Sequence, residues 1–257
     1  MIARFLAPAA TMLALACPTV ATAAPEEIQV YMDEMGAPGE IGLDVHNSYV
    51  LSGDKTPAYP GEQQSVHRYR ITPEFSLGLS RAFELGAYLP LATIDHGGAF
   101  RIQGVKLRLK YLVPRPADSH WFYGLNFEIG RVGHSLDANP YNAELKGIAG
   151  THQGKWTLAA NLNFDFKVSG PAPAPASLEL ATKANFAVTP KFALGIENYT
   201  GLGEVRGLGR FGSSEQTTYV TADTSIGKWD LNLGVGRGYG ANPDRWIVKA
   251  IVGVPFR

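Results

Sequence analysis

The chain has 257 residues, of which 18% are charged, 11% are aromatic and 29 are glycine. Its formal net charge is zero, so no basic surface for nucleic-acid binding is indicated. A hydrophobic content of 45% excludes a disordered chain, and the single cysteine, Cys17, excludes a disulfide framework.

The first 23 residues predict a secretory signal peptide. Arg4 precedes an apolar run over residues 5–16, and small residues end at Ala21-Thr22-Ala23, so we expect cleavage after Ala23. The apolar run is too short to cross a bilayer as a helix. We predict that residues 1–23 are removed and that residues 24–39 form a periplasmic N-terminal segment.

From Glu40 onward, apolar and polar residues alternate with a period of two. This alternation is typical of strands that present one face to an apolar environment. The pattern predicts about twelve strands, at residues 40–52, 66–80, 83–93, 101–113, 120–132, 141–152, 156–169, 177–189, 192–201, 216–226, 229–239 and 245–256.

The connections between these strands alternate between short and long. Two of the short ones, Gly154-Lys155 and Gly227-Lys228, have glycine at the position that a type II′ hairpin turn requires. Barrels of the bacterial outer membrane have short periplasmic turns and longer external loops. We therefore predict an all-β fold, an antiparallel transmembrane β-barrel of about twelve strands over residues 40–257, with the long loops outside the cell.

Aromatic residues support a membrane setting. Every second strand begins with an aromatic residue on its apolar face, which predicts an aromatic girdle at one membrane interface: Phe83, Trp121, Trp156, Phe192 and Trp229. The last strand ends at Phe256, followed by Arg257. An aromatic residue near the C-terminus resembles the signal read by the outer-membrane assembly machinery, so we predict that machinery and outer-membrane lipid as partners.

Two neighbouring sequences carry a family resemblance. Thr72-Pro-Glu-Phe-Ser-Leu-Gly-Leu and Phe83-Glu-Leu-Gly-Ala-Tyr-Leu-Pro resemble hairpins of bacterial outer-membrane barrels in the phenol meta-pathway or transporter-like group. The resemblance implies a passive channel or transporter in the outer membrane for a small solute. Hydrophobic and aromatic compounds are among the candidate solutes. It implies no catalytic residue and no cofactor.

Charged residues alternate with apolar ones along the strands and should therefore face the barrel lumen. The two signs nearly cancel, which leaves two interpretations open: a weakly selective path for small solutes, or a lumen plugged by salt bridges. Glu84 lies on the strand between two basic rows and is expected to bridge them. The candidate lumen residues are Arg68, Arg70, Glu84, Lys106, Arg108, Lys110, Glu128, Asp165 and Lys167.

Two other functions remain as alternatives. His46 and Ser48 share one strand face, so a lipid-acting enzyme barrel could use them as base and nucleophile. Leu43 and Val45 lie on the other, apolar face of the same strand, so His46 and Ser48 should point into the lumen, away from lipid. A soluble periplasmic β-sandwich that carries lipid is the second alternative. The six histidines lack the i,i+2 or i,i+4 spacing of ligand pairs, so no metal site is predicted.

Overall fold

The structure is a computed structural model that describes residues 27–171, 175–209 and 214–255; the predicted signal peptide (1–23) and Phe256 lie outside them. A two-residue strand, β10 (Gly207–Leu208), pairs with the end of β9. The described residues contain no helix long and apolar enough to cross a membrane. The long strands are β1 (Ile41–Gly53), β2 (Tyr69–Gly78), β3 (Phe83–Ile94), β4 (Phe100–Leu112), β5 (Trp121–Val132), β6 (Tyr141–Gln153), β7 (Trp156–Ser169), β8 (Ser177–Thr189), β9 (Phe192–Glu204), β11 (Glu215–Ile226), β12 (Trp229–Gly240) and β13 (Asp244–Val254).

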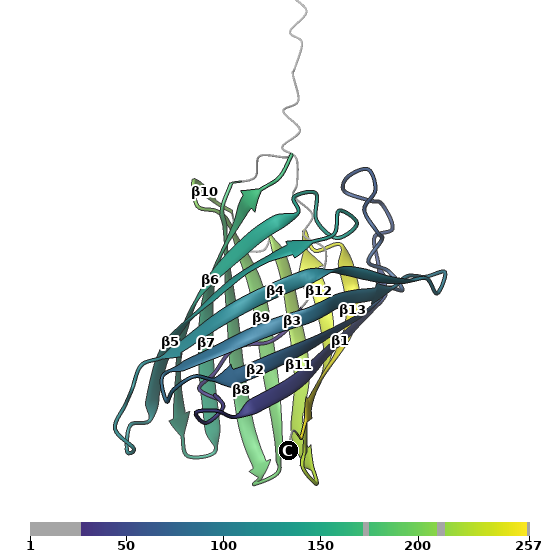
Figure 1. Cartoon of the computed structure of the whole chain (residues 1–257). Coiled ribbons are helices and arrows are strands. Elements are labelled where there is room, and N and C mark those ends of the chain that lie inside the picture. The colour runs from purple at the N-terminus through teal and green to yellow at the C-terminus, as the bar shows by residue number, and fades with distance from the viewer. Residues whose placement is uncertain (1–26, 172–174, 210–213, 256–257) are drawn as a thin grey trace, which may run out of the picture.

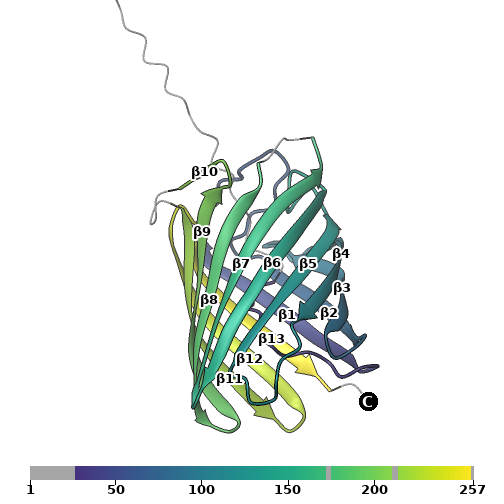
Figure 2. The same cartoon turned by 90° about the vertical axis from the view of Figure 1, so that its left-hand side faces the viewer.

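These long strands form one closed antiparallel barrel. Each strand pairs with its neighbours in sequence, and the first strand pairs with the last, from Leu43 opposite Val254 to Gly53 opposite Asp244. Figures 1 and 2 show the strands running obliquely around the wall. Closure leaves no free sheet edge, as a membrane-spanning sheet requires. The predicted barrel of about twelve strands is confirmed, and the alternative of a β-sandwich is wrong.

Strand boundaries agree with the predicted ranges to within two residues except at the start of β2 and at the end of β9, which extends to Glu204 instead of residue 201. The alternating pattern predicted a strand from residue 66, whereas β2 begins at Tyr69. His67 has a φ of 59°, a left-handed conformation that interrupts an extended strand. At the two predicted hairpins, Gly154 and Gly227 have φ values of 60° and 66°, which agrees with glycine at the first central position of a II′ turn.

The exposed and buried faces are reversed relative to a soluble protein. Along β5, Asn126 and Glu128 are buried, while the exposed positions are Trp121, Tyr123, Leu125, Phe127 and Ile129. The same arrangement recurs around the wall, where exposed large apolar side chains oppose buried polar ones. An apolar exterior around a polar interior is the pattern of a barrel whose outer surface contacts lipid.

The two ends of the barrel differ in their connections. The connections at residues 79–82, 113–120, 154–155, 190–191 and 227–228 lie at one end, called here the short-turn end. The other connections, which include the long loops 54–68 and 133–140, lie at the long-loop end, near β10 (Figure 1). The long connection 113–120 and the short connection 241–243 are exceptions to this division by length. The five predicted girdle aromatics begin strands at the short-turn end and are all exposed: Phe83, Trp121, Trp156, Phe192 and Trp229. Their role at a membrane interface stays a prediction.

Candidate functional site

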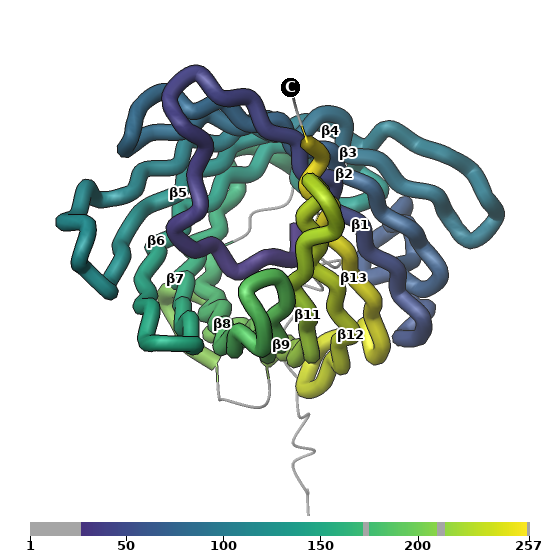
Figure 3. The backbone as a smooth tube through the Cα atoms, turned by 90° about the horizontal axis from the view of Figure 1, so that it is seen from below, coloured from purple at the N-terminus to yellow at the C-terminus, as the bar shows by residue number. Residues whose placement is uncertain are grey.

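The lumen contains part of the chain itself. Residues 27–39, called here the N-terminal segment, precede β1, and the first part of this segment lies inside the ring of strands (Figure 3). Ile28, Val30 and Tyr31 are buried and pack with wall residues that include Phe122 and Tyr219. The prediction of a periplasmic segment over residues 24–39 did not anticipate this position. The segment lies inside the lumen because Ile28 and Val30 would expose apolar surface to water outside it.

Two polar side chains of the wall hold the main chain of the N-terminal segment. The amide N–H of Tyr31 donates to Asn161 Oδ1 (2.6 Å), and Asn161 Nδ2 donates to the carbonyl oxygen of Tyr31 (2.9 Å). Lys249 Nζ donates to the carbonyl oxygen of Ile28 (2.8 Å). Asn161 lies on β7 and Lys249 on β13, so two separate parts of the wall fix the same short stretch of chain.

The side chain of Tyr31 is surrounded by cations and hydroxyl partners. Arg108, Lys110 and Lys146 lie 5.7, 5.2 and 4.1 Å from its ring centroid, within the range of cation–π attraction. The Tyr31 hydroxyl is 2.7 Å from the hydroxyl of Tyr88. A single aromatic side chain of the N-terminal segment thus contacts the wall at β3, β4 and β6.

The segment leaves the lumen at the short-turn end through further polar contacts. Asp33 forms ion pairs with Arg115 and with His152, the latter at 3.0 Å. Burial favours a raised pKa for Asp33, but the hydrogen bond and charge of His152, with the charge of Arg115, outweigh it and hold this pKa below its usual value. Farther along, the amide of Gly36 donates to Glu84 Oε2 (2.7 Å).

Ion pairs inside the lumen join both adjacent strands and strands that are not adjacent. Arg108 pairs with Glu74 and, at 2.8 Å, with Glu84. Glu84 therefore connects β3 to Arg108 of β4, which belongs to one of the two basic rows that Glu84 was expected to bridge, and it also holds the N-terminal segment. A second network joins β8, β9 and β13. It centres on Glu197, which pairs with Lys183 (3.2 Å) and Lys249 (2.5 Å).

The predicted lumen residues occupy different parts of the interior. Glu84, Arg108, Lys110 and Glu128 surround the N-terminal segment and are buried. Arg68 and Arg70 are also buried, and Arg68 lies toward the long-loop end, where its Nη1 donates to the carbonyl of Gln63 (2.7 Å). The remaining three, Lys106, Asp165 and Lys167, are half-buried. Lys167 forms an ion pair with Asp137.

Sequence reasoning missed three residues that hold the segment. Tyr31, Tyr88 and Asn161 carry no motif, and the partners of Tyr31 lie 57 and 130 residues away in sequence. The alternating pattern does place Asn161 on the inward face of its strand. It contains no information about which buried group that side chain binds.

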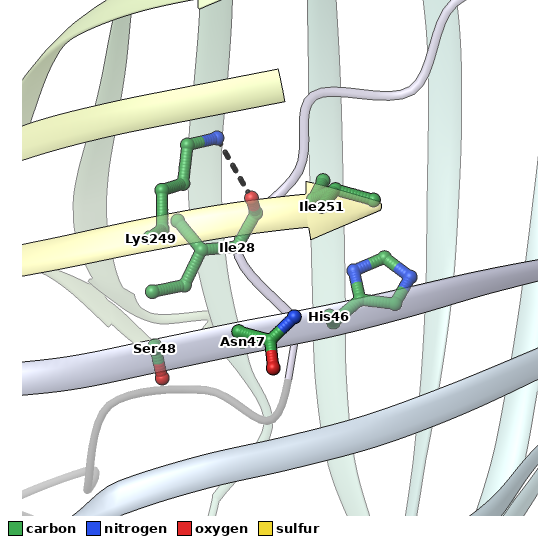
Figure 4. Close-up of a pocket in the computed structure, with 6 residues that line it drawn as sticks. All are labelled: Ile28, His46, Asn47, Ser48, Lys249 and Ile251. Atoms are coloured by element: carbon green, nitrogen blue, oxygen red, sulfur yellow. Dashed lines mark hydrogen bonds between the residues drawn. The ribbon is translucent and has the colours of Figure 1, made fainter. Parts of the chain in front are cut away.

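One small cavity lies beside the N-terminal segment. A cavity of about 10 Å³ is lined by Ile28, His46, Asn47, Ser48, Lys249 and Ile251 (Figure 4). It has room for about one water molecule. His46 contacts Glu74 at 2.9 Å, and within the described residues no hydrogen bond joins it to Ser48. The arrangement required for a serine activated by this histidine is therefore not formed.

No protein-family profile and no curated protein sequence matches the chain. Among solved structures, it is similar to the COG4313 outer membrane channel from Pseudomonas putida F1 (TM-score 0.62, 13% identity, covering 90% of this chain and 100% of that one). It also resembles the KdgM porin in complex with disordered oligogalacturonate (0.56, 12%, 84% and 99%) and the NanC porin (0.54, 11%, 84% and 99%). The chain thus has the fold of these outer-membrane β-barrel channels.

Proposed function

We propose that the protein is a channel of the bacterial outer membrane for small solutes, and that its N-terminal segment closes the lumen. One observation carries the proposal: a closed barrel with an apolar exterior has a charged interior in which Ile28, Val30 and Tyr31 of the N-terminal segment are buried. An interior lined by both signs of charge suits small polar or amphipathic solutes. Of the two interpretations left open by the sequence, this conformation favours a plugged lumen, but the N-terminal segment contributes to the plug in addition to the predicted salt bridges.

The narrower proposal on cargo rests on the hairpin residues 72–79 and 83–90. Their resemblance to the phenol meta-pathway or transporter-like group supports a hydrophobic or aromatic solute. The oligogalacturonate is bound by the KdgM porin, and we do not propose it as the solute of this chain. A channel is favoured over an enzyme because the cavity beside His46 and Ser48 has room for about one water and none for a lipid.

The proposal also assigns the surroundings of the barrel. The exposed apolar side chains of the wall contact outer-membrane lipid, and the C-terminal sequence with Phe256 is recognised during assembly. A closed barrel of this kind is expected to resist SDS until it is heated, so unheated and boiled samples should migrate differently. Fractionation with outer membranes is the second expected result; recovery of all the protein from a detergent-free periplasmic extract would contradict the proposal.

Removal of part of the segment tests the channel directly. A variant lacking residues 27–33 keeps every paired strand, since β1 begins at Ile41. In planar bilayers, we expect rare or small openings of the full chain and sustained conductance of this variant. Heat-dependent migration of both proteins controls for folding. Absence of conductance from a correctly folded variant would overturn the proposal of a channel.

A further inference from the structure

Three groups that commonly bind metals meet inside the lumen. Glu27 comes from the N-terminal segment, His46 from β1 and Glu74 from β2, and one ligand atom of each lies within 4.8 Å of the others. His46 and Glu74 are each 3% exposed. The three residues therefore form a buried cluster that joins the segment to two strands of the wall.

Two buried polar atoms of this cluster, a carboxylate oxygen and an imidazole nitrogen, have no hydrogen-bond partner in the described structure. Glu27 Oε1 and His46 Nδ1 are buried, and neither has a hydrogen bond in the described structure. The opposite oxygens of both carboxylates are held: Tyr88 donates to Glu27 Oε2 (2.6 Å), and Arg108 pairs with Glu74 Oε1. These contacts orient the carboxylates, as outer partners do around metal ligands. A buried acceptor without a donor is costly, and a proton or a cation removes that cost.

The cations near Glu27 are bonded to carboxylates other than that of Glu27. Arg108 is shared between Glu74 and Glu84, and Lys146 pairs with Glu144 at 3.1 Å. The one hydrogen-bond partner of Glu27 in the described residues is the neutral hydroxyl of Tyr88. The surroundings of Glu27 therefore lack a directly bonded positive charge, which a metal ion would supply.

We propose that Glu27, His46 and Glu74 bind a divalent transition-metal ion that ties the N-terminal segment to the barrel wall. One imidazole and two carboxylates suit Zn²⁺, Mn²⁺ or Fe²⁺. The sequence indicated no metal site because the ligands come from three elements without a spacing motif, His46 and Glu74 being 28 residues apart. Because the ion binds the docked segment, it stabilises the closed lumen by mass action.

Titration with Zn²⁺ tests the site. The full mature chain, purified without a histidine tag and treated with a chelator, is titrated in detergent by calorimetry. We expect one ion per chain, and a loss of affinity of at least about tenfold in Glu27→Gln and in His46→Asn. The matched control is His134→Asn, because His134 lies in an exposed loop against the carbonyl of Pro60 and should leave binding unchanged.

The outcomes separate this site from the channel proposal. No saturable binding to the full chain, as expected if a water or a proton occupies the cluster, would overturn the metal site. Unchanged binding in both variants would do the same. If His46→Asn does not fold, Glu27→Gln decides, because Glu27 lies outside the strands. Zn²⁺ binding with this dependence, together with no conductance from the folded variant lacking residues 27–33, would support the metal site and contradict the channel.

Discussion

Asn161 binds both the amide N–H and the carbonyl oxygen of Tyr31, a residue 130 positions earlier in the chain. The carboxamide supplies one donor and one acceptor, as a neighbouring strand would. The N-terminal segment is therefore held through its backbone by a side chain that takes no part in pairing the barrel strands. Loss of this contact should weaken docking of the segment while the strand ladders of the wall remain intact.

The first prediction follows from this contact. Asn161→Ala removes two hydrogen bonds, each worth about 0.5–1.5 kcal/mol net, so docking should weaken by about 1–3 kcal/mol. That change corresponds to an increase of about 5–150-fold in the equilibrium between open and closed lumen. Single-channel recording of the open probability measures it. Asn163→Ala is the matched control, because Asn163 lies on the same strand but bonds to Glu179 (3.1 Å). Equal open probabilities in the two variants would contradict the role of Asn161.

The alternating sequence was sufficient to predict the wall of the barrel. Residues such as Arg108 and Lys110 follow a period of two, and that period alone determines which face each side chain occupies. Glycine at residues 154 and 227 predicted hairpins because few other residues adopt positive φ at low cost. Both features are local, so neighbouring residues contain the information.

The contents of the lumen could not be predicted in the same way. Residues 27–39 have no regular secondary structure, so no period marks their position. Their contacts with Asn161 and Lys249 span 130 and 221 residues. Such contacts depend on where the closed barrel brings distant strands. The sequence indicated that polar side chains face inward, and it left the partner of each one undetermined.

The second prediction concerns acid. Because the pKa of Asp33 is held below its usual value by His152 and Arg115, its ionised form favours docking. This contribution is present above the ordinary aspartate pKa of about 3.9 and is lost as the pH falls through the lowered value. We expect open probability to rise at that acidic pH. Asp33→Asn should raise it already at neutral pH and remove this step, whereas Asp118→Asn, in an exposed turn, should retain it. Identical pH profiles for the chain and Asp33→Asn would contradict the prediction.

The third prediction concerns orientation. If the long loops are external, a cysteine at Ala58 or Leu208 should react with an impermeant maleimide on intact cells, since both residues are exposed at the long-loop end. A cysteine at Ala82, Lys155 or Lys228 should react only after the outer membrane is opened. Heat-dependent migration of each variant verifies folding. The opposite labelling pattern would mean that the barrel is inserted with its short turns outside.

The fourth prediction concerns ion selectivity. Replacement of Lys106, Arg108 and Lys110 by Gln removes three positive charges from one strand of the lumen, so the conductance should shift toward cations. Openings should also become more frequent, because Lys110 Nζ donates to the carbonyl of Glu34 in the N-terminal segment (2.6 Å). Reversal potentials in a salt gradient measure the selectivity.

A matched control for charge is available at the short-turn end. Replacement of Lys155, Lys191 and Lys228 by Gln removes the same charge from exposed turns outside the lumen and should change selectivity far less. The lumen variant removes Arg108 and leaves the buried carboxylates of Glu74 and Glu84 without this partner, which should destabilise the folded barrel. Folding is therefore checked by heat-dependent migration. If both triple variants conduct with unchanged selectivity, the permeating ions do not pass the inner face of β4.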